Sequence, residues 1–385
     1  MKIKKILRNI LFCLLSTCLF FGFAELLCRI KYHPKAFAYK GIFEYDKDKI
    51  YRLKKNIRNR KFLRKLVETN SFGYRDCEIP VKKDQFTIRL LAVGDSVTFG
   101  HGVLSEETYP QRLESLLNDR IKGYQFEVIN TAVPGNSPFQ EYYDLKRGLI
   151  FKPDIVVIQF ALNDLVEPYN VFRRYGGKRI DYHGVSDVPY WHYLLSQKSA
   201  FYIFLQDLFL RVRFWEIDSD KIKNKAILNE INLSRDAAAD EPNNPKIREA
   251  WSECLKWIQR EFDLCRSSKI ECILLVSPAR FQLFDERRTY AQKVLKRFAS
   301  QNGVECMDAL ALIKEKIRQE LISKYKLKDS TSFNEIVSGY AKDVEVIWHY
   351  YFIDNDHYAC EGHAFIADKL YPIVYSLLKN RKINI

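Results

Sequence analysis

The sequence predicts an α/β fold in which a parallel sheet of five strands is covered by helices on both faces. Two observations indicate this class. Short apolar runs rich in Val, Ile and Leu, such as 155–160, are typical of strands that are buried on both faces. These runs alternate with longer segments of helical periodicity, and strands separated by helices need crossover connections that make the sheet parallel.

Five strands and five helices are expected along the chain. The strands are expected at 88–93, 126–130, 155–160, 270–276 and 304–307. The helices are expected at 106–120, 139–148, 246–266, 286–301 and 361–378. Their alternation predicts a flavodoxin-like three-layer α/β/α sandwich. With 385 residues and 47% hydrophobic content, the chain can bury the core of one large domain.

The first expected strand ends abruptly at Gly94-Asp95-Ser96. Ser96 is thereby placed at the carboxyl edge of the sheet, where α/β proteins bind their ligands. Taken alone, Gly-Asp-Ser is most often an ordinary turn with a helix cap. A serine nucleophile also needs a base, an orienting carboxylate and donors to the developing oxyanion.

A base and an orienting carboxylate are available near the C-terminal end. Asp354 and His357 lie three residues apart, so one helical turn or tight loop brings the carboxylate against one imidazole nitrogen and leaves the other for a substrate. Together with Asp356 and His363 they could instead ligate a metal, but cysteine pairs and a His-x-x-x-His helix are both missing from the segment. We therefore expect no metal, and we expect His363 to be structural or to line the pocket. His101, close behind Ser96, either lines the site or is exposed.

Two further segments offer oxyanion donors, and each follows an expected strand. Gly135, in the loop after 126–130, allows a backbone N–H to approach a ligand closely. Asn163, directly after 155–160, carries an amide that can donate to negative charge. Taken alone, each of these segments is a turn or a strand-end loop.

Taken in order, these segments resemble the sequence blocks of the SGNH, or GDSL, hydrolase superfamily, which is named for Ser, Gly, Asn and His on separate blocks. The blocks match as Gly94-Asp95-Ser96, Gly135, Asn163-Asp164 and Asp354-x-x-His357. The resemblance spans roughly residues 70 to 375. One departure is Ala161, which stands where the third block usually begins with glycine.

The resemblance implies a serine esterase or deacylase without a cofactor. His357 would take the proton of Ser96 during attack on an acyl carbonyl, and Asp354 would hold the His357 tautomer. The Ser96 and Gly135 backbone N–H groups and the Asn163 amide would form the oxyanion hole. The expected substrate is an ester of an envelope or extracellular glycan, such as an O-acetyl group, or a lipid ester.

Two other functions remain open from the sequence. Acyl transfer to a glycan would use the same serine ester, intercepted by a sugar hydroxyl in place of water. A catalytically silent glycan-binding or assembly protein could keep the fold, but it would need neither a nucleophile nor its base. The sequence also leaves the oligomeric state and the disulfide pairing open.

The N-terminus predicts export. A basic start is followed by an uncharged, mostly apolar stretch at 9–24, near the lower limit for spanning a bilayer. We interpret residues 1–30 as a single-pass membrane anchor with the catalytic domain outside the cytoplasm. The alternative is a cleaved signal peptide and a secreted or periplasmic protein, because Gly22-Phe23-Ala24 has the small residues that signal peptidase prefers.

The net charge of +14 is concentrated partly in a basic run between Arg52 and Lys65. We interpret 31–69 as a basic juxtamembrane linker, which is a solvated face or a contact with anionic lipid or acidic glycan. Nucleic acid is a poor partner, because no binding motif accompanies the charge. Residues 70–385 are expected to form the hydrolase domain, with an insertion at about 166–244.

Overall fold

The computed structural model describes residues 2–31, 42–46, 48–62, 65–165, 238–242 and 245–381, with a few further residues between 195 and 208. They belong to two compact units. One unit combines residues 1–41 with 169–231, and the other combines 42–168 with 232–385. Most of the predicted insertion at 166–244 lies outside the described residues, so the predicted domain boundaries remain predictions.

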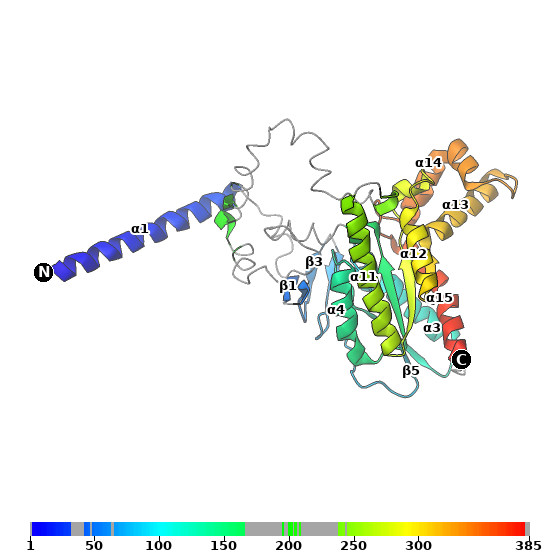
Figure 1. Ribbon diagram of the computed structural model, residues 1–385, viewed down its shortest axis with the longest axis horizontal. Coiled ribbons are helices and arrows are strands. Elements are labelled where there is room, and N and C mark those ends of the chain that lie inside the picture. Colours follow the sequence, from blue (N-terminus) through cyan, green and yellow to red (C-terminus); the bar gives the residue numbers. More distant parts are fainter. Residues whose placement is uncertain are drawn as a thin grey trace. The chain divides into compact units, whose positions relative to one another are not determined.

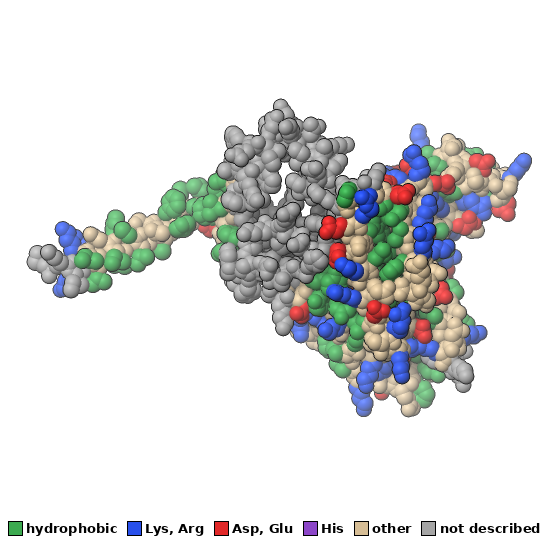
Figure 2. Space-filling model, viewed as in Figure 1, with side chains coloured by type: hydrophobic (Ala, Val, Ile, Leu, Met, Phe, Trp, Pro, Cys, Tyr) green, Lys and Arg blue, Asp and Glu red, His purple; other side chains and the backbone are tan. Residues whose placement is uncertain are grey.

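The first unit contains one long helix, α1 (Lys2–Lys31) (Figure 1). Its stretch Lys4–Ile30 is the single helix among the described residues that is long and apolar enough to cross a membrane. Hydrophobic side chains cover most of its length, and basic ones lie near its N-terminal end (Figure 2). An exposed apolar surface of this extent is typical of a signal sequence or a membrane anchor.

The second unit contains the predicted five-stranded parallel sheet. Its strands are β5 (Thr87–Val93), β6 (Gln125–Asn130), β7 (Ile155–Phe160), β8 (Glu271–Val276) and β9 (Glu305–Asp308). They are hydrogen-bonded in the order β6-β5-β7-β8-β9, and all pairs are parallel. The predicted fold class is therefore confirmed, and β5 lies between β6 and β7.

Helices cover both faces of this sheet (Figure 1). On one face lie α3 (Tyr109–Arg120) and α15 (Cys360–Asn380), which pack against each other. On the other face lie α4 (Pro138–Gly148), α11 (Pro245–Ser267) and α12 (Tyr290–Gln301). Alternate strand residues point to opposite faces, so Leu90 packs in the core with α3 and α15, whereas its neighbour Leu91 meets Gly148 of α4. The five predicted helices are all present.

Two helices extend this core beyond the prediction. They are α13 (Ala309–Tyr325) and α14 (Phe333–Tyr351), which pack against each other and bury Ile313 and Trp348 in the same core cluster. The backbone of α14 is kinked at Tyr340, where φ is −134°. Five short helices also lie among the described residues of this unit: α2 (Ser96–Phe99), η2 (Ser105–Glu107), η3 (Leu149–Phe151), η4 (Leu162–Leu165) and η5 (Arg280–Leu283).

Two short hairpins occupy the segment that the sequence analysis interprets as a basic linker. They are β1 (Phe43–Asp46) with β2 (Ile50–Leu53), and β3 (Arg60–Phe62) with β4 (Lys65–Val67). The first hairpin is joined to α4 by charged contacts. The fully buried Lys49 ammonium pairs with Asp144, and Arg147 donates to both carboxylate oxygens of Asp46 at 2.6 and 2.9 Å. These residues are thus part of the second unit.

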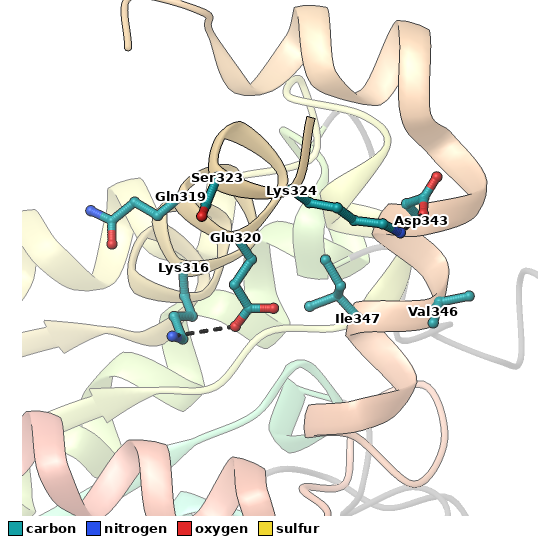
Figure 3. A pocket seen from close by; sticks show the side chains of 8 residues that line it. All are labelled: Lys316, Gln319, Glu320, Ser323, Lys324, Asp343, Val346 and Ile347. Carbon is teal, nitrogen blue, oxygen red and sulfur yellow. Dashed lines mark hydrogen bonds and ion pairs between the residues drawn. The ribbon is translucent and has the colours of Figure 1, made fainter. Parts of the chain in front are cut away.

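An open groove of about 550 Å³ lies between α13 and α14 (Figure 3). Its charged side chains are paired with one another: Lys316 lies 3.3 Å from Glu320, and Lys324 lies 2.6 Å from Asp343. Because each charge already faces an opposite one, the groove offers no unbalanced charge to a ligand. It is lined by Lys316, Gln319, Glu320, Ser323, Lys324, Asp343, Val346 and Ile347.

Candidate active site

Ser96 is the first residue of α2, directly beyond the buried strand β5. The Asp95 side chain caps this short helix by accepting a 2.9 Å hydrogen bond from the Val97 backbone N–H. The turn before this helix requires glycine at position 94, because a Cβ there would lie 2.5 Å from Thr98 Oγ1 and 2.6 Å from Gln159 Oε1. The sharp strand-to-helix turn presents the Ser96 hydroxyl at the carboxyl edge of the sheet.

His357 lies against Ser96, although 261 positions separate them in the chain. The Ser96 Oγ atom is 2.8 Å from His357 Nε2, and His357 Nδ1 is 2.8 Å from Asp354 Oδ2. If Nδ1 carries the proton and donates it to Asp354, Nε2 can accept the hydrogen of the serine hydroxyl. The structure therefore joins the three predicted side chains in one hydrogen-bonded chain.

The loop between α14 and α15 holds Asp354 in place. Its Oδ1 atom accepts the backbone N–H groups of Asp356 at 3.1 Å and of His357 at 2.9 Å. Its backbone carbonyl accepts the indole N–H of the fully buried Trp348 at 2.9 Å. The carboxylate is thus oriented by the loop itself, and the loop is tied to the core through α14.

The site electrostatics suit proton transfer through His357. Burial, the largest influence, disfavours the imidazolium, but the hydrogen bond with Asp354 and the charges of Asp356 and Asp95 outweigh it and raise the pKa of His357 above its usual 6.5. Burial also disfavours the Asp354 carboxylate, but its hydrogen bonds with His357 outweigh that effect and hold the pKa of Asp354 well below 3.8. Asp354 therefore remains charged at neutral pH.

Asp356 is a second carboxylate at the same imidazole. Its Oδ1 atom lies 3.4 Å from His357 Nδ1, and its side chain is buried. From the sequence, Asp356 is a candidate only as a metal ligand. Its place one residue before His357 was the available signal, since a tight loop brings neighbouring side chains to the same ring.

Asn163 reaches the nucleophile turn through Asp95. It lies in η4, directly after β7, and its Nδ2 atom donates to Asp95 Oδ2 at 2.7 Å. The same Asp95 oxygen lies 3.3 Å from Ser96 Oγ. In the sequence, Asp95 is part of the nucleophile block and has no predicted catalytic role. In the structure it caps α2 and also connects two of the predicted site residues.

Gly135 lies in the loop that follows β6, on the other side of β5. Its φ of +78° falls in the left-handed region that favours glycine. Upstream in this loop, the Val133 N–H donates to the Gly94 carbonyl at 3.2 Å, which keeps the loop beside the end of β5. The strand order β6-β5-β7 thus brings the Gly135, Ser96 and Asn163 segments to neighbouring strand ends.

His101 is stacked on His357. Their ring centroids are 4.0 Å apart and their planes differ by 17°. The His101 backbone N–H donates to the Ser96 carbonyl at 3.0 Å, so one turn carries both the serine and the stacked ring. His101 also packs edge-to-face against Phe62 of β3, with the ring centroids 6.5 Å apart. The sequence left open whether His101 lines the site or is exposed. The structure places it in the site.

His363 lies apart from this hydrogen-bonded chain. It is fully buried, and its Nδ1 atom accepts the Tyr109 backbone N–H at 3.0 Å. Burial, with the nearby charges of Arg75 and His357, lowers the pKa of His363 to about 3. It is therefore a neutral structural residue at physiological pH.

Among the described residues, one group of three side chains is close enough together to hold a metal ion. Ligand atoms of His101, Asp354 and His357 all lie within 4.8 Å of one another. The two imidazoles are stacked in parallel, however, and both His357 nitrogens are already engaged, by Ser96 and by Asp354. Ligating a metal through His357 would break one of these hydrogen bonds. The arrangement suits proton transfer better than metal coordination.

Comparison with known proteins agrees with this geometry. Residues 92–198, which include the Ser96, Gly135 and Asn163 segments, match the GDSL-like Lipase/Acylhydrolase family. Over these residues the chain resembles the GDSL-like lipase/acylhydrolase family, as expected from the first three sequence blocks. The fourth block, Asp354-x-x-His357, lies outside the matched region.

Similarity to individual proteins is partial. An acetylxylan esterase of Xylanibacter ruminicola is 32% identical over 90 residues, which are 22% of this chain and 18% of that protein. The match therefore spans less than a fifth of the relative's length.

Solved structures show a distant likeness to this chain. A catalytic mutant of an acetylxylan esterase from Geobacillus stearothermophilus has 15% identity and a TM-score of 0.38, covering 73% of this chain and 91% of the other. A G-D-S-L family protein of Desulfitobacterium hafniense has 12% identity and a TM-score of 0.36, covering 74% and 98%. The fold assignment rests on the strand order and helix layers of this chain itself.

Proposed function

We propose that this chain is a serine esterase that forms an acyl-enzyme on Ser96. The observation that supports the proposal most directly is the hydrogen-bonded chain from Ser96 Oγ through the His357 ring to Asp354. His357 accepts the serine proton as Oγ attacks the acyl carbonyl, and then returns it to the leaving alcohol. Water activated by the same imidazole then releases the acyl group from Ser96.

The oxyanion of the tetrahedral intermediate is assigned to three donors. The Ser96 and Gly135 backbone N–H groups lie on neighbouring strand-end loops. The Asn163 side-chain amide has two hydrogens, and Asp95 accepts one of them, which leaves the second for the oxyanion. Each such donor contributes about 2.7–4 kcal/mol if it acts like a measured oxyanion-hole donor in another hydrolase.

The proposed substrate is an O-acyl ester of a glycan, with acetyl as the favoured acyl group. The relative from Xylanibacter ruminicola, an acetylxylan esterase, supports this substrate class over the 90 residues that it matches. The deciding experiment is labelling of the full-length protein with a fluorophosphonate probe, followed by peptide mapping. Modification at Ser96 and hydrolysis of a short-chain aryl ester are expected, and an unlabelled, inactive wild-type protein would contradict the proposal.

The N-terminal helix is assigned as a retained single-pass anchor, with the catalytic unit outside the cytoplasm. The helix α1 runs without interruption through Ala24, where a signal peptidase would cut, and continues to Lys31. Intact mass measurement of protein extracted from membranes tests this assignment. A mature chain that begins at Glu25 would contradict it.

Asp354→Asn is expected to lower kcat by about 10²- to 10⁴-fold. Replacing the equivalent acid in a serine protease triad costs about 10⁴-fold, and the nearby Asp356 can replace part of the function. The variant also loses a carboxylate that raises the pKa of His357. Since the base must be neutral, activity falls as the pH drops through this pKa, and the acid limb of kcat/KM should move to lower pH in the variant.

The matched control for this experiment is Asp356→Asn. Its carboxylate also raises the pKa of His357, but the 3.4 Å contact is longer than the 2.8 Å contact of Asp354. The acid limb should therefore shift in the same direction, with a smaller loss of kcat. An unchanged pH profile in Asp354→Asn would show that Asp354 does not act on the catalytic base.

His101→Ala is expected to lower kcat by about 2- to 13-fold with little change in KM, because a stacked ring pair contributes about 0.5–1.5 kcal/mol. The stacked ring keeps the His357 plane aligned with Ser96 Oγ. His101→Phe keeps a flat ring and should retain most of the activity. Steady-state kinetics with an aryl acetate measures both variants. Equal losses in both would assign a polar role to His101 and contradict positioning by stacking.

A further inference from the structure

The first unit contains a contact between α1 and residues far along the chain. Near the end of the apolar stretch of α1, the Glu25 carboxylate accepts hydrogen bonds from Ser199 Oγ at 2.8 Å, from the Ala200 N–H at 3.0 Å and from the Phe201 N–H at 2.9 Å. Arg29, one turn later on the same helix, donates to it at 2.8 Å. Four donors from two segments thus converge on one carboxylate.

An apolar contact lies one turn earlier on the same face of α1. The ring of Phe21 meets the ring of Phe201 in an edge-to-face arrangement, with centroids 5.8 Å apart. Because Phe21 and Glu25 are four residues apart, they point in similar directions from the helix. We use the name docked segment for the described residues between 199 and 208. The docked segment contacts α1 at the Phe21 ring and at the Glu25 carboxylate.

The position of Glu25 along α1 determines how deep this contact would lie in a bilayer. The uncharged stretch Asn9–Ala24 has 16 residues and is about 24 Å long at 1.5 Å per residue, somewhat less than the roughly 30 Å hydrocarbon core of a bilayer. With the basic N-terminal end at the cytoplasmic surface, Glu25 lies inside the hydrocarbon, close to its outer edge. A carboxylate at that depth needs hydrogen-bond donors, and the docked segment supplies three of them.

The docked segment also exposes apolar side chains of its own. Leu205 is 42% exposed and Leu208 is 43% exposed, and both follow closely on the residues held by Glu25 and Phe21. Side chains of α1 itself are also apolar and exposed, with Phe23 at 62% and Leu26 at 58%. The docked segment thus adds exposed leucines to a unit whose long helix already has an apolar surface.

We propose that the docked segment is a second membrane contact of this protein, held by Glu25 and Phe21 at the outer rim of the bilayer with Leu205 and Leu208 in contact with lipid. This inference rests on the membrane anchoring proposed above. The occupant of the leucine surface is lipid, and an apolar protein partner is the competing outcome of the experiment.

Photo-crosslinking in vesicles tests the contact with lipid. The full-length protein is reconstituted into vesicles of phosphatidylcholine and phosphatidylglycerol, with p-benzoylphenylalanine in place of Leu205 or Leu208. Adducts with lipid are expected at both positions. Adducts only with protein, or no adducts, would overturn the proposal.

A second set of variants tests the docking itself. With p-benzoylphenylalanine in place of Phe21, an intrachain crosslink to the peptide containing Ser199–Tyr202 is expected by mass spectrometry. Glu25→Ala should reduce this crosslink and the lipid adducts at Leu205 at least fivefold, whereas Glu25→Asp should retain most of both. Equal crosslinking in Glu25→Ala and in the wild type would show that the Glu25 carboxylate does not hold the docked segment.

Two readouts separate this inference from the proposals on which it rests. Resistance to carbonate extraction reports anchoring by α1, and fluorophosphonate labelling of Ser96 reports the catalytic site. A protein that is retained in the membrane and labelled at Ser96 but gives no lipid adducts at Leu205 and Leu208 would contradict the docked segment alone. A protein released by carbonate would contradict the anchoring.

Discussion

Ser96→Ala is expected to lower ester hydrolysis by at least 10³-fold in kcat. In a well-studied serine protease, loss of the nucleophile or of the base costs about 2 × 10⁶-fold in kcat. The same result is expected for His357→Ala, because the 2.8 Å contact joins nucleophile and base in one proton transfer. The measurement is steady-state hydrolysis of an aryl acetate by full-length protein in detergent.

A double variant tests whether Ser96 and His357 act in the same reaction. Ser96→Ala combined with His357→Ala should be no slower than either single variant, since residues that act as one unit have non-additive effects. Thermal unfolding should be nearly unchanged in Ser96→Ala, because only one partly buried hydroxyl is removed. Multiplicative losses in the double variant, or substantial hydrolysis in Ser96→Ala, would show that the two residues do not share one reaction.

Lys49→Met is expected to destabilise the second unit by about 3–5 kcal/mol, the typical cost of removing one partner from a buried ion pair. Lys49 is fully buried and its partner Asp144 is nearly so. Burial lowers the pKa of Lys49 and raises that of Asp144, in each case against the attraction of the pair. Without the ammonium, the carboxylate would remain buried, and the Asn136 amide would be its remaining donor among the described residues, at 2.7 Å.

Denaturant unfolding followed by near-ultraviolet circular dichroism measures this loss. Lys49→Met combined with Asp144→Asn should recover much of it, because no unpaired charge is then buried and the Asn136 hydrogen bond can persist. Lys324→Met is the matched control, since Lys324 is 57% exposed beside Asp343 and should cost less than about 1 kcal/mol. A loss in Lys49→Met no larger than in the control would show that the first hairpin contributes little to the stability of the unit.

The sheet could be predicted because its strands are locally encoded. In β5 and β7 every residue is buried, so the apolar runs in the sequence mark these strands directly. By contrast, α14 carries Val344, Val346 and Trp348, which have modest helix propensity, and its backbone is kinked at Tyr340. Its helical form depends on packing Trp348 into the core, and this contact is not visible in a local pattern.

The hairpins at 43–67 escaped prediction for a related reason. Their strands have three or four residues each, and the basic residues among them are typical of a solvated linker. Lys49 looks like one more surface charge in the sequence. Only the partner Asp144, 95 positions away, makes it a buried residue that joins the hairpin to α4.

The sequence by itself determined the fold class, the family resemblance and the side chains proposed for catalysis. Buried parallel strands leave long apolar runs, and the family blocks keep their residue types and order. Tertiary structure alone decided that Ser96 and His357 meet and that His101 stacks on the base. These contacts join residues up to 261 positions apart, and the closure of α15 against α3 brings them together, so no local pattern encodes the distances between them.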